Sequence, residues 1–278
     1  MNKIPRVCVW HTQGDTYRDA LRERLPDTPI EVINAATHET GEAVLGALDS
    51  GPVANHATSV IADAISSAEI LLAWKVPPRT LTSMPALRWV QVTGAGVDHF
   101  LESTELSAAV IVTRSLGRFG IQISEYVIGY LLHHLIGIHT YREKQRSHEW
   151  ARNNRPLLAD RTVGIIGLGS LGLPTANALT ALGARVLGVS HSGLAVPGID
   201  DVFSARNWRN MLPACDVLVI AAPKTVETVG MIDQRALDAL PKGTILINIS
   251  RGELIDEDAL LEALENGHLG AAVLDVFA

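Results

Sequence analysis

Cysteine is scarce in this 278-residue sequence, which has only Cys8 and Cys215. Each lies beside an apolar run that reads as a strand, so we expect two buried, reduced thiols and no disulfide. No apolar run is long enough to span a membrane, and no apolar segment of signal-peptide length follows the charged N-terminus. We therefore expect a soluble, cytoplasmic protein.

An excess of positive charge is also absent. The formal net charge is −7, which argues against nucleic acids and anionic membranes as partners. Hydrophobic residues make up 47% of the sequence, enough for one or two buried cores in a chain of this length. Two domains are therefore the expected organisation.

The most informative segment is a glycine-rich turn that follows an apolar run at residues 163–166 and precedes a helix-compatible stretch. A second apolar run follows, so the order is strand, turn, helix, strand, which is the dinucleotide-binding unit. The turn's three glycines permit, in order, the tight turn, close approach of a pyrophosphate, and packing of helix on strand. The helix start adds free N–H groups. The predicted cofactor-binding residues are Gly167, Leu168, Gly169, Ser170, Leu171 and Gly172.

Apolar runs and helical patterns alternate along the chain, which predicts an α/β fold with parallel sheets covered on both faces. Expected strands are residues 7–10, 30–33, 69–73, 88–92, 163–166, 186–189, 217–221, 245–249 and 272–276. Expected helices are residues 17–25, 174–182, 234–240 and 257–265. Asp233 and Asp256 are the predicted N-caps of the last two helices. Residues 34–60 read as a variable loop with at most one helix.

The ends of these strands locate the expected site. In open α/β sheets, ligands bind beyond the carboxyl ends of the strands. Residues at those ends should therefore converge on the bound dinucleotide, namely Ala222, Pro223, Ser250, Arg251 and Asp275.

One long helix is predicted over residues 121–150. Its first half is apolar on a wide face and its second half is strongly charged. A helix with so broad an apolar face usually lies in an interface or between domains. We therefore expect a homodimer built on this helix.

Several motifs resemble those of the D-isomer-specific 2-hydroxyacid dehydrogenases. Residues 246–260 and 267–277 are closely similar to that family, and residues 222–228 match its Pro-x-Thr-x-x-Thr stretch. Residues 92–98 and 123–126 match its substrate-domain and long-helix segments, whereas Trp74-Lys75 and residues 114–120 look most like its glyoxylate/hydroxypyruvate reductase branch. The resemblance implies two Rossmann-like domains, flavodoxin-like and doubly wound, with the active site in the cleft between them. We assign residues 1–105 to the substrate domain, completed in the family by a C-terminal segment, and residues 106–278 to the NAD(P)-binding domain.

The resemblance also implies the chemistry, which is hydride transfer between a nicotinamide and C2 of a small 2-keto or 2-hydroxy acid. The cation that polarises the keto group maps on Arg251, for which the alternative is a surface pair with Glu253 or Asp256. Gly94, Ala95 and Gly96 map on the loop that binds the substrate carboxylate. Trp74 and Lys75 would line the pocket, although Trp74 alternatively packs in the core. Thr228 and Ile249 join the implied cofactor-binding residues.

The same resemblance exposes a gap. The family's catalytic acid, in a Glu-Pro after Asp-Val-Phe, and its Pro-His histidine would both fall beyond Ala278. We expect none of the ten histidines, including His133, His134, His148 and His268, to replace that histidine. Either the chain is a truncated enzyme or it is a shortened relative, and a stop inside a motif favours truncation. We expect such a chain to bind cofactor and to turn over slowly.

The cofactor preference is indicated at the end of the second strand of the dinucleotide unit. NAD-specific members carry an acid there for the ribose 2′-hydroxyl, but this sequence has Ser190, His191 and Ser192. Two hydroxyls and an imidazole can donate to a 2′-phosphate. We predict NADP(H) as the preferred cofactor, with NAD(H) possible, and Arg206 or Arg209 as an additional contact.

Two functions remain open from the sequence. The first is an NAD(P)-dependent oxidoreductase acting on glyoxylate or hydroxypyruvate, favoured by Arg251 and the residue 94–96 loop. The second is a dinucleotide-binding sensor that senses partners through the long helix and catalyses nothing, favoured by the missing acid and base. No metal site is predicted.

Overall fold

The fold was analysed in a computed structural model that describes residues 5–33, 63–117, 119–150, 152 and 155–278. The chain divides into two compact units, Met1–Leu116 and Gly117–Ala278. The division falls later than the predicted boundary after residue 105, because Ile111–Arg114 (β5) pairs with β4 in the first sheet. The predicted loop at residues 34–60 lies outside the described residues. Within the described ranges, no helix has the length and apolarity needed to cross a membrane.

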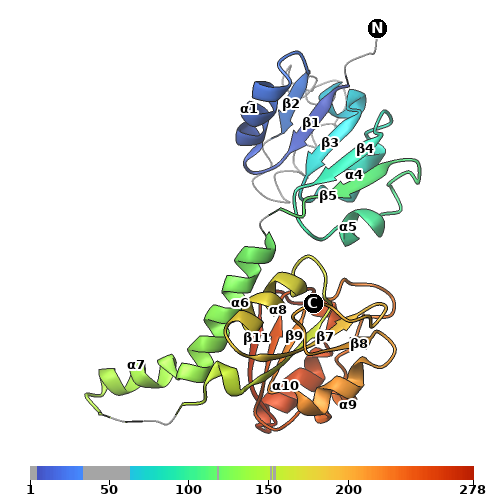
Figure 1. The fold of residues 1–278 in the computed structure, drawn as a ribbon. Helices are drawn as coiled ribbons and strands as arrows, with labels where there is room; N and C mark the ends of the chain where they lie inside the picture. The colour runs from blue at the N-terminus through green and yellow to red at the C-terminus, as the bar shows by residue number, and fades with distance from the viewer. Residues whose placement is uncertain (1–4, 34–62, 118, 151, 153–154) are drawn as a thin grey trace. The chain divides into compact units, whose positions relative to one another are not determined.

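The first unit is built on a five-stranded parallel sheet with the order β2-β1-β3-β4-β5 (Figure 1). Its strands are β1 (Val7–Trp10), β2 (Ile30–Ile33), β3 (Ile70–Ala73), β4 (Trp89–Val92) and β5. Its labelled helices are α1 (Gly14–Arg24), α4 (Pro78–Thr82) and α5 (Asp98–Leu101). This strand order is the flavodoxin-like one, as predicted. α1 packs on one face through Tyr17 and Leu21, and α4 and α5 pack on the other through Leu81 and Phe100.

The second unit holds a six-stranded parallel sheet with the order β11-β10-β9-β6-β7-β8. Its strands are β6 (Thr162–Ile166), β7 (Arg185–Ser190), β8 (Asp201–Ser204), β9 (Val217–Ile220), β10 (Thr244–Asn248) and β11 (Leu269–Leu274). Its helices are α6 (Phe119–Ile136), α7 (Ile138–Arg146), α8 (Gly172–Ala181), α9 (Gln234–Asp238) and α10 (Glu257–Glu265), with 3₁₀ turns at Leu158–Asp160, Trp208–Ala214 and Gly252–Leu254. The chain runs outward from β6 to β8 and returns to β9, so the strand order reverses between β6 and β9. That reversal is the point at which doubly wound folds bind dinucleotides.

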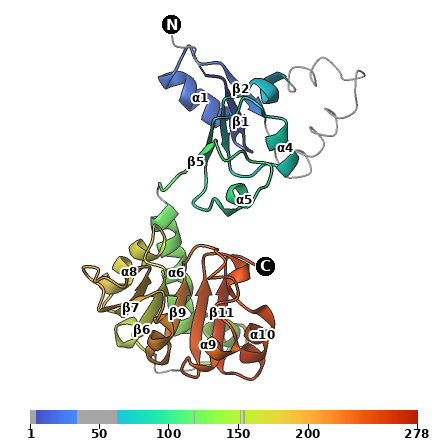
Figure 2. The ribbon, with the colours of Figure 1, turned by 90° about the vertical axis from the view of Figure 1, so that its right-hand side faces the viewer.

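Two apolar layers enclose this second sheet (Figures 1 and 2). α6 and α8 cover one face, where Leu131 and Leu179 pack on strand residues such as Ile165. The 3₁₀ turn Trp208–Ala214 and helices α9 and α10 cover the other face, where Leu237 and Leu260 pack. Burial on both faces explains why the strands are continuous apolar runs. The α/β prediction is confirmed.

The predicted long helix is wrong in one respect, because it is two helices. Gly137 adopts φ +70° and ψ 40°, which ends α6 and starts α7 as a separate helix. Glycine takes this left-handed conformation without the cost that a side chain imposes. α7 has no buried residue, so its charged sequence is fully compatible with solvent (Figure 1).

The predicted helix caps and thiols are confirmed. The side chain of Asp233 accepts from the backbone N–H of Ala236, and that of Asp256 accepts from Ala259. Cys8 and Cys215 are free and buried. Burial, with a smaller contribution from Asp216, raises the pKa of the Cys215 thiol to about 12, so this thiol stays protonated and unreactive at neutral pH.

Two strands were not predicted from the sequence. β5 contains exposed Ile111 and Arg114, and β8 contains exposed Asp201, so neither strand is an apolar run. Both lie at sheet edges, where one side of the strand faces solvent. Edge strands β2 and β11 were predicted, so the weak signal of β5 and β8 comes from their polar, exposed residues and not from edge position alone.

Candidate functional site

The strand register of the second unit aligns the carboxyl ends of its strands. Ile166 at the end of β6 lies beside Val189 of β7 and Ile220 of β9. Ile220 in turn lies beside Asn248, and Asn248 beside Leu274. The segments that follow these residues therefore emerge at one edge of the sheet. Within this unit, the structure brings together the predicted cofactor-binding residues from five strands.

The glycine-rich turn after β6 has no room for side chains at two of its three glycines. Gly167 has φ +102°, and a Cβ there would come within 2.8 Å of the backbone of Ala222. A Cβ at Gly172 would overlap the carbonyl oxygen of Gly167. A Cβ at Gly169 would meet nothing within 4 Å. The space at Gly169 is therefore open, as close approach of a phosphate requires.

The same turn carries backbone donors without an acceptor among the described residues. Among the described residues, no acceptor is bonded to the N–H of Gly169, Ser170 or Leu171. The N–H of Leu168 is engaged, because it donates to the carbonyl of Val189 at 3.0 Å. Three consecutive free donors at the start of α8 fit a pyrophosphate, whose oxygens accept such bonds. The turn therefore fits a dinucleotide, although the N–H groups of Gly167 and Leu168, two of the six predicted cofactor-binding residues, are already bonded to the carbonyl of Val189.

The start of α6 lies against the same turn, which the sequence did not indicate. A Cβ at Gly120 would be 2.5 Å from the carbonyl oxygen of Ser170 and 2.8 Å from Pro174. One turn further along α6, the buried Ser124 hydroxyl lies 3.2 Å from that of Thr175 on α8. Ser124 also bonds the carbonyl of Gly120, and Thr175 that of Leu171. These contacts hold the glycine-rich turn from its outer side.

The end of β7 forms a second polar turn. The hydroxyl oxygen of Ser190 accepts from the N–H of Gly193 at 3.0 Å, and that of Ser192 accepts from Leu194 at 3.3 Å. Each hydroxyl therefore keeps its own proton for a further acceptor. His191 is exposed. Arg209, suggested as an extra contact, instead pairs with Asp233 at 3.0 Å and stacks over Trp208.

The segments after β9 and β10 are bonded to one another. The hydroxyl of Ser250 donates to the carbonyl of Ala222, which joins the two strand ends. Thr228 has its hydroxyl directed to the carbonyl of Pro223 at 2.7 Å, so it closes the turn of residues 223–228. Ile249 is 3% exposed and packs in the core together with residues of α6 and α8.

Arg251 lies directly beyond this pair of strands and is held by a buried asparagine. The side chain of Asn248, which is fully buried, donates to the carbonyl of Arg251 at 2.8 Å and accepts from the N–H of Ser250 at 3.0 Å. Each of the two acids considered as alternative partners for Arg251 also has another contact. Glu253 pairs with Lys224 at 3.0 Å, and Asp256 caps α10. Asn248 was not predicted from the sequence as a site residue, because it lies within an apolar run. A polar residue inside such a run is the signal that could have identified it, since buried polar groups need hydrogen-bond partners.

Asp275 follows β11 at the same edge. Its backbone N–H donates to the carbonyl of Asn248 at 3.0 Å, and its side chain is exposed. The pKa of Tyr126 on α6 is raised, first by burial and then by the negative charge of Asp275. The Asp275 carboxylate therefore acts electrostatically on α6. Beyond it, a Cβ at Gly252 would overlap the backbone of Phe277 and Ala278, so the last residues run against the Arg251 turn.

In the first unit, the predicted substrate-binding residues lie at the carboxyl ends of β3 and β4. Trp74 follows β3 and is 59% exposed, so it is not a core residue. The indole packs on the loop after β4, because a Cβ at Gly94 would be 3.1 Å from the ring. Lys75 places its Nζ 6.0 Å from the centre of the Trp74 ring. His99, a residue missed from the sequence, bonds the carbonyl of Trp74 at 2.6 Å.

The loop of Gly94, Ala95 and Gly96 also presents backbone donors. In the described part of the chain, none of these three N–H groups is bonded to an acceptor. Such a run of free amides fits a carboxylate. The carbonyl of Ala95 is bonded by Arg114 at 2.7 Å. The two units thus each carry a loop with unbonded backbone amides at the carboxyl edge of a sheet.

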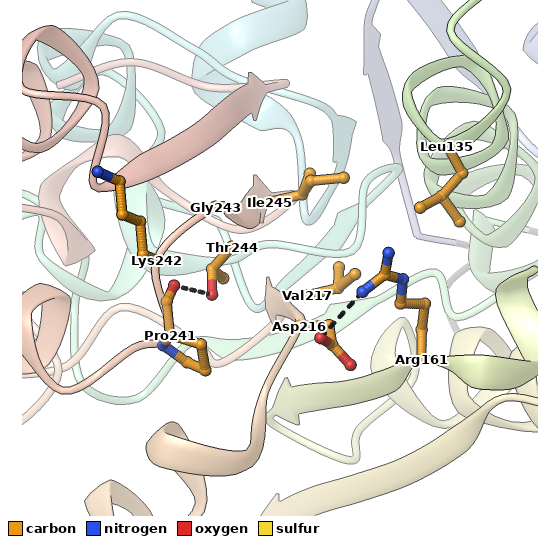
Figure 3. A pocket seen from close by; sticks show the side chains of 9 residues that line it. All are labelled: Leu135, Arg161, Asp216, Val217, Pro241, Lys242, Gly243, Thr244 and Ile245. Atoms are coloured by element: carbon orange, nitrogen blue, oxygen red, sulfur yellow. Dashed lines mark hydrogen bonds and ion pairs between the residues drawn. The ribbon is translucent and has the colours of Figure 1, made fainter. Parts of the chain in front are cut away.

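His133, His134 and His268, three of the histidines that are not expected to act as the proton donor, lie away from the glycine-rich turn. His133 and His134 lie near the end of α6, next to Leu135, which lines a pocket of about 150 Å³ (Figure 3). That pocket also contacts Val217 and Thr244, the first residues of β9 and β10, so it lies at the amino edge of the sheet. His268 directly precedes β11 and bonds the carbonyl of Leu237 at 2.9 Å. These histidines are therefore at the edge opposite the glycine-rich turn.

The pocket in Figure 3 has a structural explanation of its own. Arg161 pairs with Asp216 at 3.2 Å, and the same carboxylate accepts from the N–H of Thr162 at 2.8 Å. These bonds tie the start of β6 to the start of β9.

Nowhere in the described ranges do three histidine, cysteine or acidic side chains form a group that could hold a metal ion.

Comparisons with known proteins agree with this geometry. Residues 128–278 match the family described as D-isomer specific 2-hydroxyacid dehydrogenase, NAD binding domain. The chain is 35% identical over 217 residues to glyoxylate/hydroxypyruvate reductase A of Serratia proteamaculans, covering 76% of this chain and 69% of that protein.

Solved structures match over almost the whole chain. A D-isomer specific 2-hydroxyacid dehydrogenase family protein from Aeromonas salmonicida aligns with a TM-score of 0.82 at 31% identity, covering 99% of this chain and 82% of that one. An NADPH-dependent glyoxylate/hydroxypyruvate reductase from Sinorhizobium meliloti, solved with NADP and sulfate, aligns with a TM-score of 0.81 at 28% identity, covering 98% and 81%. With its two sheets, its glycine-rich turn and these similarities, the chain belongs to the D-isomer specific 2-hydroxyacid dehydrogenase family.

Proposed function

We propose that this protein is an NADPH-dependent oxidoreductase that reduces a small 2-keto acid of the glyoxylate or hydroxypyruvate class to the 2-hydroxy acid. The observation that carries the proposal is the pair of anion-binding loops with free amides, at residues 169–171 and 94–96. The first fits a dinucleotide pyrophosphate, and the second fits the carboxylate of a small acid. The reductases from Serratia proteamaculans and Sinorhizobium meliloti have activities of this class by name.

Each residue of the proposed site has a separate role in the reaction. NADPH, when bound, supplies a hydride to C2 of the keto acid. The guanidinium of Arg251 attracts the keto oxygen, its positive charge stabilises the negative charge that develops there, and the oxygen takes its proton from water, which makes the turnover slow. The amides of Ala95 and Gly96 hold the carboxylate, and Trp74 and Lys75 line the substrate pocket. Asn248 keeps the Arg251 turn in place through two hydrogen bonds.

The direct test is NADPH oxidation by the purified chain with a panel of carbonyl compounds. We expect glyoxylate and hydroxypyruvate to be reduced, with glycolate and glycerate as products. Glycolaldehyde is the matched control, because it keeps the reactive carbonyl of glyoxylate but lacks the carboxylate. Equal rates with glyoxylate and glycolaldehyde would contradict the proposed carboxylate site.

NADPH is preferred over NADH in this proposal. The Ser190 and Ser192 hydroxyls keep protons for a 2′-phosphate, and exposed His191 adds a third donor. Relatives from Xanthobacter autotrophicus and Sinorhizobium meliloti were solved with NADPH and NADP. NADH remains a weaker alternative, because no acid is present at this turn to hold its ribose hydroxyls.

Replacing Ser190 by aspartate should reverse much of this preference. The carboxylate can still accept from the N–H of Gly193, so the turn is retained, but it repels a 2′-phosphate. We expect the ratio of the NADPH and NADH affinities to shift toward NADH by about 10- to 100-fold. Ser190→Asn is the matched control, with the same size and no charge, and it should shift the ratio little. A tighter affinity for NADH in the unaltered chain would refute the preference.

A homodimer is also part of the proposal. Exposed apolar side chains lie along α6 and at the start of α7, including Ile121, Tyr130 and Ile138 at 54%, 46% and 38% exposure. Exposed apolar side chains of this size favour burial against a second copy. We expect twice the chain mass by light scattering at micromolar concentration, and a shift toward monomer for Ile121→Lys. A monomeric mass for the unaltered chain would disprove this interface.

The cellular location is proposed on the state of the cysteines. Both thiols are free and buried, as is usual for proteins of a reducing compartment. We propose the cytoplasm as the place of action.

A further inference from the structure

Arg114 contacts the loop of Gly94, Ala95 and Gly96, which is proposed above to bind the substrate carboxylate. Arg114 is the last residue of β5 and lies beside Val92, the last residue of β4. The loop of Gly94, Ala95 and Gly96 begins two residues after Val92. The Arg114 Nη1 donates to the carbonyl oxygen of Ala95 at 2.7 Å, a short distance typical of a charge-assisted hydrogen bond.

Peptide geometry gives this contact a consequence for Gly96. The described chain has no cis peptide bond. In a trans peptide, the carbonyl of one residue and the N–H of the next point in opposite directions. Fixing the Ala95 carbonyl toward Arg114 therefore fixes the Gly96 N–H away from Arg114. The positively charged guanidinium of Arg114, bonded to the Ala95 carbonyl, also polarises the peptide, which makes the Gly96 N–H a stronger donor.

Other contacts hold the rest of the loop, so the Ala95–Gly96 peptide is the part whose orientation depends on Arg114. The stem is fixed by two bonds, from the N–H of Thr93 to the carbonyl of Ala73 and from the N–H of Ser115 to that of Val92, both at 2.9 Å. Gly94 is confined by the ring of Trp74. For the carbonyl of Ala95, the bond from Arg114 is the contact that sets its direction.

We propose that Arg114 is a positioning residue for substrate binding, which acts by orienting and polarising the Ala95–Gly96 peptide so that the Gly96 N–H binds the substrate carboxylate. This inference rests on the proposed function, because it assumes that the loop binds a carboxylate. It makes Arg114 a determinant of substrate affinity, and it leaves cofactor binding to the second unit unaffected.

The test uses the full chain, labelled with ¹⁵N-glycine, saturated with NADPH and titrated with oxalate as the carboxylate probe. In the unaltered chain, we expect oxalate to shift the Gly96 amide resonance. Arg114→Met removes both the donor and the charge and should weaken oxalate about tenfold, with loss of the Gly96 shift. Arg114→Lys keeps a charged donor and should lose only about threefold. NADPH affinity should be unchanged in both variants.

Arg88→Met is the matched control. Arg88 lies at the opposite end of β4, is 80% exposed and has only a 3.8 Å contact with Glu69 among its ion pairs in the described residues. It removes the same charge from the same unit and should leave oxalate affinity unchanged.

The inference is overturned if Arg114→Met binds oxalate within about twofold of the unaltered chain, or if oxalate leaves the Gly96 amide unshifted in the unaltered chain. An unshifted Gly96 amide is also the result expected if the Arg114 guanidinium binds oxalate directly. If Arg114→Met does not fold by circular dichroism, the Arg114→Lys titration and the Gly96 shift decide the question. Failure of the proposed function is distinguishable, because it would appear as absence of NADPH binding or of NADPH oxidation.

Discussion

Replacing Gly169 by valine is expected to abolish NADPH binding while the fold remains intact. A Cβ at Gly169 meets nothing within 4 Å, and the residue is not among those with positive φ, so valine is accommodated without strain. Its side chain would occupy the space in front of the amides of residues 169–171, where the pyrophosphate is expected. Charge-assisted bonds to such amides are worth about 1.5–3 kcal/mol each. We therefore expect the affinity to fall at least about 100-fold by calorimetry.

The two other glycines of the turn are unsuitable for this test. A Cβ at Gly167 or Gly172 would meet backbone atoms of the turn itself, so a loss of binding there would also report damage to the fold. Gly129→Val on α6 is the better control, since a Cβ there also meets nothing within 4 Å. It should retain NADPH affinity. Unimpaired NADPH binding by folded Gly169→Val would place the pyrophosphate elsewhere.

Replacing Arg251 by glutamine should lower the rate of glyoxylate reduction far more than it lowers NADPH affinity. The neutral amide cannot supply the positive charge that stabilises the developing alkoxide, and a lost donor of this kind typically costs about 10²–10³ in kcat. Asn248 bonds the backbone carbonyl of residue 251, so that bond should survive, whereas the bond from the Arg251 Nη1 to the carbonyl of Ser250 at 2.7 Å is lost. Arg251→Lys keeps the charge but not the planar fork and should be intermediate.

Rates are followed through the absorbance of NADPH under saturating cofactor, with NADPH affinity measured separately. Arg235→Gln provides the control, because Arg235 is an exposed arginine on α9 in the same unit. It should keep the full rate. A rate for Arg251→Gln within about threefold of the unaltered chain would exclude Arg251 as the polarising cation.

The apolar core of the fold was predictable because its signals are local. Parallel strands buried on both faces must be apolar along their whole length, so β1, β6, β9 and β10 could be identified from short runs of sequence. The caps Asp233 and Asp256 act within one helical turn, and the glycine-rich turn is contained in six consecutive residues. The edge strands β5 and β8 were not predicted, because their solvent-exposed polar residues interrupt the apolar run that identifies a strand.

The candidate site divides in the same way. Residue types with a required chemistry, such as Gly169, Ser190 and Arg251, were identified from the sequence and from the resemblance that it carries. Residues that act through another residue were not. Gly120 and Arg114 are distant in the sequence from their partners Ser170 and Ala95, and Asn248 acts on the backbone of Arg251. No local sequence pattern indicates such pairs.

The sequence by itself therefore determined the two α/β units, the dinucleotide turn and the identity of the groups that can bind phosphate and carboxylate. Only the tertiary structure decided that Gly137 divides the predicted long helix, and which carbonyls and amides at the strand ends are already bonded. Sequence periodicity reports which side chains are buried. The direction of a single peptide group depends on a partner from a neighbouring strand, as Ala95 depends on Arg114, and that partner is brought close only by the sheet register.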